Sequence, residues 1–286
     1  MFFHLVNLLP LGGRGCQTRP LYPTSSAMIS FIRRLLFFAV CVCPPLVGAL
    51  DLSTETTSMI ATKIWKNECN ESVLGLTHWN KGEVFPSMGI GHFIWYTEER
   101  KECFEQTFPQ LLLFFKHHGV TLPAWLDQAK GCPWKSRDDF YREIHSPRMR
   151  ELRQLLFTYK DLQARFMVQR LEKVLDDIVQ ALPEEARPKM IFLISALTSN
   201  AQGLYALIDY LNFKGSGLSP KEGYQGQQWG LFQVLQKVAV RPLLADFVAA
   251  GKEVLNNRVE KAPPDRQDEV KWLPGWLSRL DTYLEP

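Results

Sequence analysis

The sequence predicts a mainly α-helical domain of the α+β class, with one small glycine-rich β-hairpin after its first helix. Two observations lead to this prediction. Through most of the chain beyond residue 50, apolar residues recur at steps of three and four, which is the period of one helix face. Between residues 74 and 96, four glycines and a proline interrupt that period, and short apolar runs typical of strands replace it.

Residues 1–49 are interpreted as a leader that precedes a single folded domain at residues 50–286. From Met28 the leader shows two arginines, an apolar run over 35–42 and small residues within 47–49. This is the pattern of a cleaved secretory signal peptide. We expect translation to start at Met28, because that start gives a signal peptide of ordinary length, and we expect an exported protein, periplasmic or secreted.

An uncleaved membrane anchor is the alternative interpretation of the same segment. Pro44 and Pro45 interrupt its apolar run, which is shorter than the ~20 residues that a spanning helix needs. We therefore expect no stable membrane anchor.

The charge of the chain is concentrated in the leader. The whole sequence carries 33 basic and 30 acidic residues, and the leader holds four of the basic residues and none of the acidic ones. Its removal leaves 29 basic and 30 acidic residues, a net charge of −1. A nearly neutral domain lacks the field that holds many phosphates, so nucleic acid is not an expected partner.

The mature chain has three cysteines, Cys69, Cys103 and Cys132. An odd number leaves at least one thiol free, and three are too few for a disulfide-framed mini-protein. Two possibilities stay open: a Cys103–Cys132 bridge, or three thiols buried as small hydrophobic side chains.

The first predicted helix, Thr57–Cys69, presents Glu68 at its end, just before the glycine-rich segment. Further helices are predicted at Phe104–Lys116 and Pro123–Ala129, because glycine and proline mark the breaks between apolar periodic runs.

The clearest helical period spans Met149–Leu182 and ends at Pro183, which cannot continue a helix. The next segment, Lys189–Ser199, is apolar almost all round and predicts a central buried helix. A last helix of this group is predicted at Leu204–Phe213.

Glu68 has a definable chemistry. Cleavage of a glycosidic bond requires an acid that protonates the leaving oxygen, and a glutamate buried among aromatic side chains can stay protonated near neutral pH. Ile64, Trp65, Trp79 and Phe85 are the expected apolar walls around it.

These residues carry a resemblance to a known family. A glutamate that ends the first helix, Ser87, and the run Gly89-Ile90-Gly91-His92 are similar to the active-site segment of phage-type lysozymes. The second half resembles the same family at residues 206–217 and 258–260, and residues 272–283 are expected to close the domain. Only the glycine turn with its upstream glutamate is specific.

The resemblance implies a role for each matching residue. Glu68 takes the general acid, Ser87 takes the place of the family's threonine that orients water or substrate, and His92 supports the turn. If the register differs, Glu71 is the alternative acid. As a bare pattern, a glutamate at a helix end is usually a solvated surface charge.

The sequence departs from the family where its catalytic aspartate belongs, since Asn80 and Lys81 occupy that region. Glu83 is a substitute that would polarise a water molecule, although it is also a simple hairpin-tip carboxylate. Alternatively no second carboxylate acts, as in lytic transglycosylases and goose-type lysozymes, which resemble this layout in relying chiefly on one glutamate.

Aromatic and amide side chains in glycine-rich segments can stack on sugars and hydrogen-bond to them. The segment around Gly230-Leu231-Phe232-Gln233 is similar to a Gly-Leu-Met-Gln string of transglycosylases, but its order relative to Glu68 differs. The predicted substrate-binding residues are Trp79, Asn80, His92, Tyr224, Gln225, Gln228 and Trp229.

No metal or other cofactor is expected. The chain has no His-Glu-x-x-His helix and no Cys-x-x-Cys pair, and His117 and His118 are adjacent, so they cannot face one ion from one side of a helix. A serine nucleophile is not indicated either, because no Gly-x-Ser-x-Gly elbow occurs.

The sequence-based hypothesis is therefore an exported, monomeric bacterial enzyme that cleaves the β-1,4 bond of peptidoglycan strands, by hydrolysis or by transglycosylation. The alternative is a lysozyme-like protein without activity that binds glycan or inhibits a partner. Burial of Glu68 among aromatics facing a groove favours catalysis, and an exposed, unpartnered Glu68 favours binding.

Overall fold

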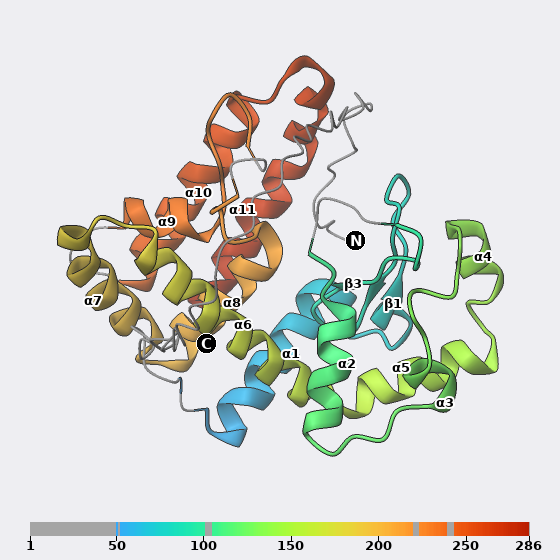
Figure 1. The fold of residues 1–286 in the computed structure, drawn as a ribbon. Coiled ribbons are helices and arrows are strands. Elements are labelled where there is room, and N and C mark those ends of the chain that lie inside the picture. Colours follow the sequence, from blue (N-terminus) through green and yellow to red (C-terminus); the bar gives the residue numbers. More distant parts are fainter. Residues whose placement is uncertain (1–49, 51, 101–104, 220–222, 239–242, 286) are drawn as a thin grey trace, which may run out of the picture.

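The computed structural model describes residues 50, 52–100, 105–219, 223–238 and 243–285, and confirms a mainly helical fold with one small sheet (Figure 1). The leader and Cys103 lie outside the described residues, so the structure does not test the choice between a Cys103–Cys132 bridge and three buried thiols. The α-helices are α1 (Thr54–Cys69), α2 (Phe108–His117), α3 (Ala124–Asp127), α4 (Arg137–Arg142), α5 (Pro147–Thr158), α6 (Lys160–Gln180), α7 (Arg187–Thr198), α8 (Ala201–Lys214), α9 (Leu231–Lys237), α10 (Leu244–Glu260) and α11 (Leu273–Asp281). Short 3₁₀ segments are η1 (Leu74–Leu76), η2 (Glu184–Ala186), η3 (Pro264–Trp272) and η4 (Thr282–Leu284).

Helix α1 begins three residues earlier than predicted because Ser53 caps it, its hydroxyl accepting from the backbone N–H of Thr56. The helix ends at Asn70, which adopts a left-handed conformation with φ 52°. Its buried face includes Ile60 and Ile64 and brings Glu68 into the interior.

The predicted helix Met149–Leu182 is in fact two helices, α5 and α6, which meet at Tyr159. Tyr159 has φ −105° and ψ 33°, outside the helical range, so the apolar period continues while the backbone turns. The longer helix, α6, packs against α1, α2, α7 and α8 and runs through the middle of the fold (Figure 1).

The glycine-rich segment forms a three-stranded antiparallel sheet rather than a simple hairpin. Its strands are β1 (Thr77–His78), β2 (Ser87–Met88) and β3 (Phe93–Ile94), in the order β1-β2-β3. Ser87 pairs with His78 on one side and Ile94 on the other, so it sits on the central strand.

The central buried helix is α8, and the prediction that Lys189–Ser199 holds that place is wrong. In α7 the side chain of Phe192 is 59% exposed, and one apolar face lies outward. Helix α8 buries residues on all sides, including two charged ones, Asp209 and Lys214. Both helices are rich in apolar residues and both pack against α6 and α9, and α8 is distinguished by further packing against α1 and η4.

Within the described part of the chain, no single helix is long and apolar enough to cross a bilayer. One bent pair, residues 184–198 and 201–214 at 113°, meets the length and composition criteria only when taken together.

Candidate functional site

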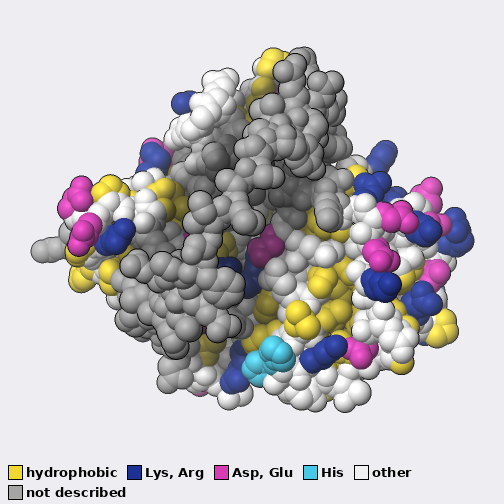
Figure 2. Space-filling view, in the orientation of Figure 1, with side chains coloured by type: hydrophobic (Ala, Val, Ile, Leu, Met, Phe, Trp, Pro, Cys, Tyr) yellow, Lys and Arg dark blue, Asp and Glu magenta, His cyan; other side chains and the backbone are white. Residues whose placement is uncertain are grey.

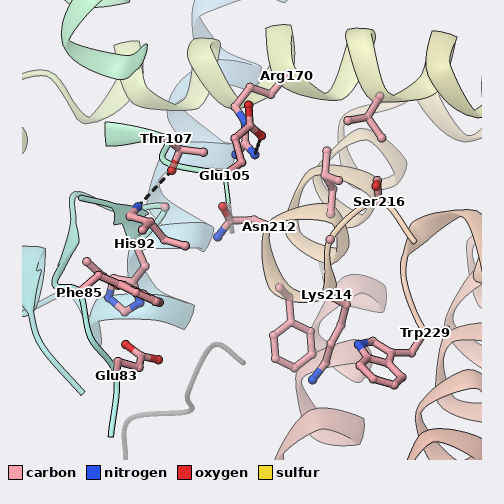
Figure 3. Close-up of a pocket in the computed structure, with 17 residues that line it drawn as sticks. Glu83, Phe85, His92, Glu105, Thr107, Arg170, Asn212, Lys214, Ser216 and Trp229 are labelled. Carbon is pink, nitrogen blue, oxygen red and sulfur yellow. Dashed lines mark hydrogen bonds and ion pairs between the residues drawn. The ribbon is translucent and has the colours of Figure 1, made fainter. Parts of the chain in front are cut away.

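A cavity of about 220 Å³ lies between the small sheet and the C-terminal end of α8. Glu83, Phe85 and His92 line one side of it, and Asn212, Lys214 and Trp229 line the other (Figure 3). Among the coloured residues of Figure 2, basic and acidic side chains are interspersed around the rim of this face, and an acidic side chain lies in the hollow at its centre.

The glycine turn is held against α6 by Gln163, a fully buried side chain. Its amide oxygen accepts from the backbone N–H of Ile90 at 2.9 Å, and its NH₂ group donates to the Leu156 carbonyl at 2.6 Å. Gly89 has φ +74°, and a Cβ there would overlap the Gln163 amide oxygen. Glycine is therefore required at this position by both conformation and space.

The turn places the side chain of His92 in the interior. His92 has a backbone φ of 49° and is only 7% exposed. Its Nδ1 lies 3.1 Å from Glu68 Oε2, and its Nε2 lies 3.8 Å from Cys69 Sγ. Burial lowers the pKa of His92, but the contacts with Cys69 and Glu68 outweigh it and raise the pKa to about 10. The imidazole is therefore a buried cation at neutral pH.

Glu68 lies in a buried ion-pair network instead of lining the cavity. Its side chain is fully buried, and Arg279 Nη2 donates to its Oε1 at 2.5 Å. Arg279 also makes two 2.8 Å hydrogen bonds to Asp209, which accepts a further bond from the Tyr283 hydroxyl at 2.6 Å. The network joins α1, α8 and the C-terminal segment.

The expectation that Glu68 stays protonated near neutral pH is wrong. Burial by itself raises its pKa, as expected, but attraction to Arg279 and the hydrogen bond with His92 outweigh burial and lower the pKa to about 2. Glu68 is therefore ionised, and its two cationic neighbours are the reason.

Glu83 has the properties that were expected of Glu68. It lines the cavity, and its Oε2 is buried without a hydrogen-bond partner among the described residues. Burial raises its pKa to about 7, against the lowering effects of the Asn80 side chain and of His92. A carboxyl group with this pKa can both hold and release a proton near neutral pH.

The expected sugar-stacking role of Trp79 is not what the structure shows. Its indole is 3% exposed and packs edge-on against Phe140, and its Nε1–H donates to the backbone carbonyl of Glu83 at 2.9 Å. Asn80 is also buried, with Oδ1 at 2.8 Å from His78 Nε2. Neither residue lines the cavity, and both position Glu83.

Of the predicted residues in the 224–229 segment, only Trp229 lines the cavity. The Tyr224 hydroxyl donates to Glu269 at 2.7 Å, and Gln228 donates to the Ser219 carbonyl at 2.7 Å, so both are engaged in structural hydrogen bonds. Gln225 is exposed in a tight turn with φ 50°. Ser87 and His92, by contrast, both line the cavity.

Several residues of the site were not predicted: Asn212, Lys214, Asp209, Arg279 and Arg170. Asp209 and Lys214 carried a usable signal, because they are charges in an otherwise apolar helix and so require buried partners. Arg279 carried none, since its partners are distant in sequence.

A second carboxylate, Glu105, lines the cavity beside Arg170, whose Nη2 lies 3.5 Å away (Figure 3). Its side chain is 60% exposed. Among the described residues, no group of three or more histidine, cysteine or acidic side chains lies close enough to hold a metal ion.

Comparison of the chain with protein-family models, with curated proteins and with solved structures gives no match.

Proposed function

We propose that this protein is a glycosidase that cleaves the β-1,4 bond of peptidoglycan strands, with Glu83 in place of Glu68 as the general acid. The observation that carries the proposal is Glu83 itself, a mostly buried carboxyl group on the cavity wall whose pKa is raised to about 7. Such a group is the acid that glycosidic cleavage requires.

In the proposed reaction, Glu83 donates its proton to the glycosidic oxygen as the bond to the anomeric carbon breaks. The bonding electrons stay on that oxygen, and the sugar develops oxocarbenium character. The cation His92 lowers the pKa of Glu83 and therefore stabilises the carboxylate that forms. A water molecule, or a hydroxyl of the sugar itself, then bonds through its oxygen to the anomeric carbon and returns a proton to the Glu83 carboxylate.

Glu68 serves this site indirectly. Its negative charge keeps His92 protonated, and Arg279 keeps Glu68 ionised. Glu68 and Arg279 are therefore positioning residues, because they act on Glu83 through His92.

The alternative function is glycan binding without cleavage. It is favoured by one observation, the location of Glu68 outside the cavity wall and within a network of ion pairs. A protein of this kind would keep the aromatic wall at Phe85 and Trp229 but would release no product.

The test is mass spectrometry of soluble products after purified peptidoglycan is incubated with the full chain and with three variants. Glu83→Gln keeps the shape of the side chain but removes its acid, and we expect it to abolish product release. Glu71→Gln removes an exposed carboxylate near the end of α1 and should release products like the wild type.

Glu68→Gln is the third variant, with circular dichroism as a check on its folding. Loss of products in folded Glu68→Gln but not in Glu83→Gln would contradict our assignment and return the acid to Glu68. Reducing-end products indicate hydrolysis, and anhydro products indicate transglycosylation. No products from the wild type would favour the binding function.

A further inference from the structure

The cavity wall opposite Glu83 ends in a lysine that has no anionic partner within the described part of the chain. Lys214 is 4% exposed and closes helix α8, and its Nζ is buried with no hydrogen-bond acceptor among the described residues. The amine rests on two aromatic faces, 3.9 Å from the ring centroid of Phe213 and 3.4 Å from that of Trp276. Figure 3 shows the side chain of Lys214 beside that of Trp229.

The neighbouring cations differ from Lys214 because each has its own carboxylate. Arg258 shares the Trp276 ring with Lys214, at 4.8 Å, and pairs with Glu269 at 2.9 Å. Arg279 shares the Phe213 ring, at 4.3 Å, and is paired with Glu68 and Asp209, as described above. Each arginine thus has a carboxylate partner, whereas Lys214 has none among the residues that the structure describes.

A second unpaired donor lies on the same turn of α8. Asn212 lines the cavity, and its Nδ2 is buried without an acceptor in the described structure. Its side chain projects into the middle of the cavity in Figure 3. Buried donors nearly always find an acceptor, and two unused donors on one cavity wall indicate an acceptor that arrives with a ligand.

We propose that the Lys214 side of the cavity binds a carboxylate group carried by the glycan substrate. The flexible four-carbon stem of Lys214, which lines the cavity, lets the amine reach that carboxylate, and Asn212 supplies a further donor. The inference rests on the proposed function only in that the ligand is a glycan. Peptidoglycan offers two kinds of free carboxylate: that of the sugar's lactyl group where no peptide is attached, and those of the peptide where one is attached.

The electrostatics predict that binding is linked to proton uptake. Burial and the positive charge of Arg258 lower the pKa of Lys214 well below its usual range, Arg279 adds to this effect, and Glu269 and Glu68 oppose it. A bound carboxylate favours the ammonium form and raises that pKa. Wild-type protein should therefore take up protons as it binds an acidic sugar at slightly alkaline pH.

The test is isothermal titration calorimetry of the full chain at pH 8, in two buffers of different ionisation enthalpy, which reveals proton uptake. The probes are N-acetylglucosamine, N-acetylmuramic acid and an N-acetylmuramyl dipeptide, whose lactyl group is amide-linked. The variants are Lys214→Met and, as a matched control, Lys130→Met. The Lys130 side chain is 80% exposed and lies outside the cavity.

We expect at least one acidic probe to bind roughly tenfold or more tightly than N-acetylglucosamine, with proton uptake. Lys214→Met should lose both effects, and Lys130→Met should keep them. Preference for muramic acid assigns the lactyl carboxylate, and preference for the dipeptide assigns a peptide carboxylate. Equal binding of all three probes, or a preference that survives in Lys214→Met, would overturn the inference.

This assay does not depend on cleavage. Selective binding by a protein that releases no products would leave the carboxylate subsite standing and contradict only the glycosidase proposal. Product release without a preference for carboxylate-bearing probes would support the glycosidase proposal and contradict the carboxylate subsite.

Discussion

Replacing Arg279 with methionine is the most direct perturbation of the buried network. The change removes the ion pair to Glu68 and both hydrogen bonds to Asp209, and leaves two carboxylates in the interior. Breaking a buried pair by removing one partner costs about 3–5 kcal/mol of unfolding free energy. We expect a loss of that size at pH 7.

The pH dependence gives a sharper result because the contribution of Glu68 is predicted to shrink in the variant. In the wild type, the pKa of Glu68 falls from 4.5 to about 2 on folding. At about 1.4 kcal/mol per pKa unit, this contributes about 3 kcal/mol, present above pH 4.5 and lost as the pH falls towards 2. Without Arg279, only His92 opposes the effect of burial, so the pKa of Glu68 should rise and its contribution to stability at neutral pH should shrink.

The assay is urea unfolding followed by tryptophan fluorescence at pH 4 and pH 7. Lys271→Met is the control, because it removes only a solvent-exposed ion pair with Asp268, and exposed pairs of this kind contribute little to stability. The deficit of Arg279→Met should be smaller at pH 4 than at pH 7. A deficit no larger than that of Lys271→Met, or one that grows in acid, would refute the reasoning.

Three further predictions follow from individual contacts. If Glu83 is the acid, peptidoglycan cleavage should fall as the pH rises through about 7, measured as a pH–rate profile, and a rate that keeps rising to pH 9 would contradict this. In thermal unfolding, Gly89→Ala should lower the free energy of unfolding by at least about 1 kcal/mol more than Gly226→Ala does. Both glycines have positive φ, but of the two only Gly89 lacks space for a Cβ. Equal losses in the two variants would show that space is unimportant. Lys214→Met should raise the free energy of unfolding by about 1 kcal/mol or more, because it removes a buried amine that has no acceptor among the described residues. The gain should shrink as the pH rises towards 10.5, where the lysine of the unfolded chain is also neutral. A loss of stability at pH 7 would contradict this account.

Much of the helical framework was predictable because helix periodicity is a local property. The apolar steps of α1, α2, α6 and α8 are visible in sequence, and caps such as Ser53 lie within three residues of the groups they satisfy. The break at Tyr159 was missed, because apolar residues keep their spacing across it. The choice of α8 over α7 as the buried helix was missed for a different reason, since both segments are apolar and only their neighbours differ.

The candidate site was predicted in part. Ser87 and His92 line the cavity because the glycine turn that carries them is specified by neighbouring residues. Tyr224 and Gln228 do not line it, because each has a structural hydrogen-bond partner, Glu269 and Ser219 respectively, that spacing alone does not indicate.

By itself, the sequence determined the class of fold, the position of the glycine turn, and the presence of two glutamates, Glu68 and Glu83, on either side of β1. Only the tertiary structure decided which of them holds a proton. Glu68 meets Arg279, which lies 211 residues away, and becomes a buried anion. Glu83 lies mostly buried on the cavity wall and forms no ion pair with a cation of the described segments. A carboxyl pKa depends on burial and on nearby charges, and both are properties of segments that come together only in the folded chain.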